Sequence, residues 1–83
     1  MYKSLLKGYI DSLKKEDIIK FIDKNNYQVS NKEIDIIYFY IKNYWEDIFD
    51  NKKEIWDKIS QDVSPTTFNA IQDLYQKYKK FLG

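Results

Sequence analysis

Residues 31–45 read Asn-Lys-Glu-Ile-Asp-Ile-Ile-Tyr-Phe-Tyr-Ile-Lys-Asn-Tyr-Trp, a segment in which apolar and aromatic side chains outnumber polar ones. Ile34, Ile37, Ile41 and Trp45 recur at steps of three and four, which is the period of one face of an α-helix. Further apolar side chains cover much of the remaining circumference: Ile36, Phe39, Tyr40 and Tyr44. A helix that is apolar nearly all round either lies at the centre of a bundle or covers a partner, and both interpretations stay open.

The same spacing of apolar residues continues on both sides of this segment. It predicts helices over residues 2–13, 15–25, 31–44, 51–61 and 65–81, joined by short connections. The pair Asn25-Asn26 suits a left-handed turn at the end of the second helix. Strict alternation of apolar and polar residues, which would indicate strands, is missing. We therefore expect an all-α fold, with residues 1–83 forming one compact single-domain bundle of about five short helices.

Three residues are expected to cap helices. Ser30 precedes the third helix, and Glu33 stands three positions later, as in a capping box. Ser64 precedes Pro65, a favoured residue for the first turn of the last helix. Asp50 is expected to be the N-cap of the fourth helix. These signals predict where the helices begin and assign no chemistry.

The composition excludes several function classes. All 14 basic residues are lysines, 13 residues are acidic, and the net charge is +1. Nucleic-acid binders usually show a clear basic excess with arginines, so this balance argues against nucleic acid as a partner. The chain has no histidine and no cysteine, which removes thiolate nucleophiles, Ser-His-Asp triads and the usual zinc sites. We expect no catalytic residues, no metal and no cofactor, and hence no enzyme.

No targeting or membrane segment is recognisable. The N-terminal residues lack the apolar run of a signal peptide, since Asp11 arrives too early. No apolar run approaches the roughly 20 residues needed to span a bilayer. The expected location is the cytoplasm, without membrane association.

Residues 55–75 offer an alternative, because their length and the Val63-Ser64-Pro65 turn suit a helix-turn-helix. Lys58 stands where a small residue normally lets the helices approach, and Asp62 stands where the turn usually has glycine. No basic residue follows in the last helix before Lys77, so only weak nucleic-acid binding is expected. Lys77, Lys79 and Lys80 are explained without a ligand, because cations stabilise the C-terminal end of a helix.

Several short motifs carry a family resemblance. They are Leu13-Lys14-Lys15-Glu16-Asp17-Ile18-Ile19-Lys20-Phe21, Val29-Ser30-Asn31-Lys32-Glu33, Asp47-Ile48-Phe49-Asp50, and Val63-Ser64-Pro65-Thr66-Thr67 leading to Leu74-Tyr75. Over roughly residues 13–80 the chain resembles a family of small Firmicutes proteins, domain of unknown function 2624. It departs at Asn26, where the family tends to have glycine, and at Lys14-Lys15, where it tends to have Thr-Pro. The resemblance implies a short helical cytoplasmic protein and supplies no functional residues.

The remaining functional expectation is a protein-interaction or regulatory module. Tyrosine and tryptophan are favoured at interfaces because they join a large apolar body to a polar tip. The candidate surface lies on the third helix, and its partner would be another protein or a second copy of the chain. Its residues are Ile36, Phe39, Tyr40 and Tyr44.

Overall fold

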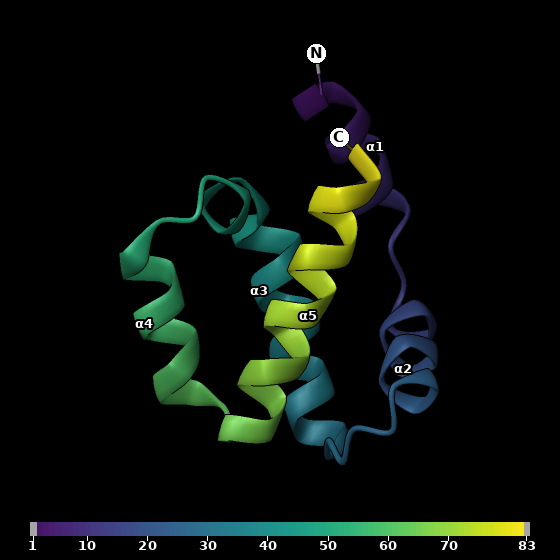
Figure 1. Cartoon of the computed structure of the whole chain (residues 1–83), viewed down its shortest axis with the longest axis vertical. Helices are drawn as coiled ribbons and strands as arrows, with labels where there is room; N and C mark the ends of the chain where they lie inside the picture. Colours follow the sequence, from purple (N-terminus) through teal and green to yellow (C-terminus); the bar gives the residue numbers. More distant parts are fainter. Residues whose placement is uncertain (1, 83) are drawn as a thin grey trace.

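Five α-helices form most of the chain in a computed structural model that describes residues 2–82 (Figure 1). They are α1 (Tyr2–Ser12), α2 (Lys15–Lys24), α3 (Asn31–Phe49), α4 (Lys53–Asp62) and α5 (Pro65–Leu82). No strand occurs in the described residues. The expected all-α bundle of five helices is confirmed.

The longest helix, α3, is the central element. It packs against each of the other four helices, and α4 also packs against α5. In Figure 1, α5 crosses in front of α3, while α2 and α4 stand on opposite sides. The side chains that α3 buries come from more than one of its faces: Ile34, Ile37, Tyr40, Ile41 and Ile48. A helix surrounded in this way needs apolar residues around most of its circumference, which explains the composition of residues 34–48.

The serine caps are confirmed. The Ser30 hydroxyl accepts a hydrogen bond from the Glu33 N–H (3.2 Å), and the Ser64 hydroxyl accepts one from the Thr67 N–H (3.3 Å). Pro65 is the first residue of α5, where its missing N–H would have no intrahelical partner. Both helices therefore begin where the sequence predicts.

The expected capping box at Ser30 is wrong, because the Glu33 carboxylate turns toward α5 instead. Its Oε2 accepts a hydrogen bond from the Ser64 N–H (2.6 Å), and its Oε1 accepts one from the Thr67 hydroxyl (2.6 Å) and one from the Ser64 hydroxyl (3.1 Å). The hydrogen bond from Thr67 is the main reason why the pKa of Glu33 lies below its ordinary value. One carboxylate thus ties together the N-terminal ends of α3 and α5.

The end of α3 and the role of Asp50 require a correction. The helix continues to Phe49, through non-helical dihedral angles at Tyr44 (φ −131°, ψ 23°), and does not stop at residue 44. Asp50 is the C-cap of α3 and not the N-cap of α4, which begins at Lys53 after Lys52. The helix extends beyond residue 44 because Ile48 is buried in the core, and this burial stabilises the additional turn.

Asparagine ends both α2 and α3. Asn26 and Asn51 have positive φ values of 60° and 56°. At each site the following residue reaches back in the 6→1 hydrogen bond of a Schellman motif, from Tyr27 N–H to Ile22 O (3.0 Å) and from Lys52 N–H to Asp47 O (3.1 Å). The turn expected at Asn25-Asn26 is confirmed, and the matching one at Asn51 explains why α4 starts late.

Candidate functional site

The four residues of the predicted partner surface do not share one exposed face of α3. Phe39 is 53% exposed, whereas Tyr40 is only 5% exposed. Ile36 and Tyr44 are half-buried and pack against the core. The rings of Phe39, Tyr40 and Tyr44 contact one another, with centroids 5.6–6.1 Å apart. Most of this aromatic group therefore consolidates the packing of the bundle.

The prediction that Tyr40 belongs to an exposed partner surface is wrong. Its hydroxyl donates a hydrogen bond to the carboxylate of Asp62, the last residue of α4, and its ring is covered where α4 packs against α3. Burial, followed by the hydrogen bond to Asp62, raises the pKa of Tyr40 to about 12. What remains on the surface is the Phe39 ring with polar neighbours on its helix, Asp35 and Asn43, both exposed. A single exposed phenylalanine is ordinary for a protein surface.

The helix-turn-helix alternative gains no support from the hairpin of α4 and α5. Thr67 and Ala70, near the start of α5, are buried, so they cannot reach a nucleic-acid groove. The exposed residues of this segment are neutral or acidic: Thr66, Asn69, Gln72 and Asp73. Phosphate contacts need cations, and the first lysine of α5 is Lys77.

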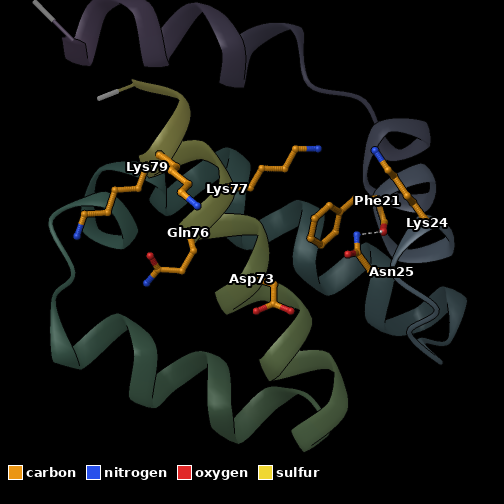
Figure 2. A pocket seen from close by; sticks show the side chains of 8 residues that line it. Phe21, Lys24, Asn25, Asp73, Gln76, Lys77 and Lys79 are labelled. Carbon is orange, nitrogen blue, oxygen red and sulfur yellow. Dashed lines mark hydrogen bonds between the residues drawn. The ribbon is translucent and has the colours of Figure 1, made fainter.

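A groove between α2 and α5 forms a concave feature of the surface, with a volume of about 700 Å³ (Figure 2). It forms because α2 and α5 both pack on α3 from different sides. The residues that line it come from α2 and the C-terminal half of α5: Phe21, Lys24, Asn25, Asp73, Gln76, Lys77, Lys79 and Lys80. We call it the α2–α5 groove.

The α2–α5 groove is mainly basic, with a small apolar contribution from Phe21, which is 9% exposed. The Lys77 ammonium lies 5.5 Å from the centre of the Phe21 ring, and Figure 2 shows its side chain reaching from α5 toward α2, where Lys24 stands on the opposite wall. Neither Lys24 nor Lys77 pairs with a carboxylate of a described side chain. Asp73, the acidic residue of the lining, accepts a hydrogen bond from the Tyr27 hydroxyl. The groove therefore presents positive charge.

Sequence reasoning missed this groove because Lys24 and Lys77 stand more than fifty positions apart and meet only in the folded bundle. The distribution of charge along the chain was the available signal. Residues 31–62 hold eight carboxylates and five lysines, whereas the other residues hold five carboxylates and nine lysines. The near-zero net charge conceals an excess of carboxylates in residues 31–62 and an excess of lysines in the other residues, which line the groove.

The described residues supply neither a metal site nor a membrane span. No group of three or more histidine, cysteine, aspartate or glutamate side chains comes together among them in a way that could hold a metal ion. None of the helices in residues 2–82 combines the length and the apolar character needed to cross a bilayer.

Four helices gathered around α3, with a groove lined by lysines between α2 and α5, define this chain as a small all-α bundle. It belongs to the family described as protein of unknown function DUF2624, whose model matches residues 1–79. The family resemblance noted over residues 13–80 is thereby confirmed and extends across α1. No curated protein matches the chain, and no solved structure matches it either.

Proposed function

We propose that this chain is a protein-interaction module of the cytoplasm, without catalytic activity, which binds a partner protein in the α2–α5 groove. The observation that carries the proposal is the groove itself: a concavity of about 700 Å³ that the packing of the other four helices on α3 leaves open. Ligand sites in proteins are usually concave and apolar, with a few charged groups that fix orientation. The lysine stems and the exposed edge of Phe21 provide the apolar part, and the ammonium groups of Lys24 and Lys77, which pair with no carboxylate of a described side chain, provide the charge.

The aromatic surface of α3 is a weaker site for the same function. Phe39 is the only member of that group that is more than half exposed. Interfaces need a cluster of buried anchors to contribute binding energy, and one ring surrounded by polar residues does not provide it. We therefore propose the α2–α5 groove, and not the Phe39 ring, as the partner site.

A photo-crosslinking amino acid introduced in the native host tests the proposal. Position 76 lies in the groove, and Gln76 is exposed, so its replacement leaves the core intact. Position 69 is the matched control: Asn69 is exposed on the same helix, two turns earlier and on a similar face, outside the groove. Position 39 tests the aromatic surface.

We expect a discrete protein adduct from position 76 and none from position 69, with the partner identified by mass spectrometry. An adduct from position 39 alone would move the binding site to α3. The absence of a protein adduct from all three positions would refute an interaction through either surface.

A further inference from the structure

We infer that the occupant of the α2–α5 groove is an acidic segment of another protein, whose carboxylates pair with Lys24 and Lys77 while an apolar side chain covers Phe21. This inference rests on the proposed function and specifies the chemistry of its partner. Three observations support it: the positions of the lysines on their helices, the lack of carboxylate partners for these lysines, and the distribution of acidic residues along the chain.

The lysines of the groove are not fully explained by the helices that carry them. Lys79 and Lys80 belong to the last turn of α5, where cations stabilise the helix end, but Lys77 lies before that turn. At the end of α2, the Phe21 carbonyl already accepts hydrogen bonds from the Asn25 N–H (3.1 Å) and from the Asn25 side chain (2.8 Å). Lys24 itself lies in the last turn of α2, where a cation stabilises the helix end, so Lys77 is the lysine of the groove that its own helix does not explain.

Both walls of the groove thus present ammonium groups without carboxylate partners among the described side chains. Two like charges that face one concave site repel each other, and an anionic occupant removes that repulsion. The methylene stems of the lysines, together with the exposed edge of the otherwise buried Phe21 ring, provide apolar surface beneath the charges. An acidic segment with one apolar side chain complements both the ammonium groups and the apolar surface beneath them.

The uneven distribution of charge along the chain also favours the groove as the site where an acidic segment binds. Residues 31–62 carry more carboxylates than lysines, although four of these carboxylates pair with lysines, whereas the remaining residues carry more lysines than carboxylates; this imbalance favours the approach of an acidic segment to the groove. A polyanion such as nucleic acid would meet the same attraction, but the chain has no arginine, and its net charge of +1 gives little sequence-independent affinity.

A second copy of the chain also carries acidic residues, and its α3–α4 side could enter the groove. Such a contact joins two different surfaces, and when it is made head to tail it gives a ring or an open-ended chain of subunits. A groove of about 700 Å³ is suited to a short segment and not to the broad face of another bundle. We therefore assign the site to a segment of a different protein.

Disulfide tethering tests this chemistry directly, because the chain has no cysteine of its own. Gln76→Cys places a single thiol in the groove, and Asn69→Cys places one on the same helix outside it. The probes are two short synthetic peptides, each with one cysteine and identical leucines. One carries several glutamates, and the other carries glutamine in their place. Labelling at equilibrium over a series of reductant concentrations gives their relative affinities even when binding is weak.

We expect Gln76→Cys to prefer the acidic probe by about 5- to 30-fold, the change equivalent to two exposed ion pairs of roughly 0.5–1 kcal/mol each. The preference should weaken in high salt and disappear when Lys24→Glu and Lys77→Glu are added. Both lysines are exposed, so this double change leaves the core intact, which circular dichroism can verify. Asn69→Cys should show little preference.

Equal labelling by the two probes at position 76, or a preference that survives the charge reversal, would overturn the inference. Self-association of the unmodified chain that is abolished by Lys24→Glu and Lys77→Glu would assign the groove to a second copy and would overturn it equally. A crosslinked partner at position 76 together with indifference to probe charge would leave the proposed function standing and reject only the acidic segment.

Discussion

Glu33 of α3 and Thr67 of α5 are joined by a hydrogen bond of 2.6 Å from the Thr67 hydroxyl to the Glu33 carboxylate. Thr67 is the single fully buried polar residue among the described side chains, with no exposed area. Glu33 thereby satisfies the hydroxyl of this buried threonine, and it also accepts a hydrogen bond from the Ser64 N–H. The relation connects two helix starts that lie more than thirty residues apart in the sequence.

Glu33→Ala should destabilise the protein by about 2–3 kcal/mol, because it leaves the Thr67 hydroxyl and the Ser64 N–H without their charged acceptor. Urea unfolding followed by circular dichroism measures the change. The matched control is Glu46→Ala, since Glu46 is exposed on the same helix, and its removal should change stability by less than about 0.5 kcal/mol. Equal stability of the two variants would contradict this role of Glu33.

Acid should selectively weaken the same contact. The pKa of Glu33 in the folded protein lies below its ordinary value of 4.5, mainly because of the Thr67 hydrogen bond. The stabilisation is therefore complete above pH 4.5 and is lost as the pH falls through the lower folded-state value. The free energy of unfolding, measured in steps below pH 4.5, should fall more for the unmodified chain than for Glu33→Gln, so that the difference between the two proteins decreases. A difference that stays constant in this range would refute the assignment.

Tyr40 should be among the last of the eight tyrosines to ionise, since burial and its bond to Asp62 raise its pKa to about 12. Between the ordinary value of 10.0 and about 12 the unfolded chain loses this proton before the folded one, so stability falls as the pH rises. Tyr40→Phe should remove a late phenolate transition from the ultraviolet absorbance titration and cost about 1 kcal/mol at neutral pH. Tyr38→Phe provides a control in which that transition remains.

Gly8→Ala should stabilise the protein by roughly 0.5–1 kcal/mol. Gly8 lies inside α1, and an added Cβ atom would meet no other atom within 4 Å. Alanine loses less conformational freedom than glycine on forming a helix, so the gain comes at no steric cost. A rise in the thermal unfolding midpoint checks the prediction, and an unchanged or lower midpoint would show that α1 is not helical at this position in solution.

Helix existence and type were predictable here because local spacing decides them. Ser30 and Ser64 also marked their helix starts correctly, since a cap acts on backbone groups only three residues away. The end of α3 was not predictable from such signals. Asp50 has the side chain of an N-cap, yet the burial of Ile48 extends the preceding helix, and the left-handed Asn51 turns the chain only afterwards.

The candidate site depended on contacts that no local pattern encodes. Tyr40 was assigned to the surface because the aromatic residues of α3 exceed one helical face, but α4 covers that side and Asp62 accepts the hydroxyl. The α2–α5 groove arises only when Phe21 and Lys77 approach across the bundle. The sequence shows an excess of lysines outside residues 31–62. This excess indicates a basic surface, but it does not locate the groove within that surface.

The position of α3 determines how the molecule must come apart. Because α1, α2, α4 and α5 each rest on this one helix, neither the first two helices nor the last two have a complete interior without it. The chain should therefore unfold in a single all-or-none transition, and a protease that cuts within residues 31–49 should leave no stable fragment. Cleavage of α3 would then unfold the whole protein. The amount of this protein in a cell would therefore be unusually sensitive to any change that exposes α3 to proteases.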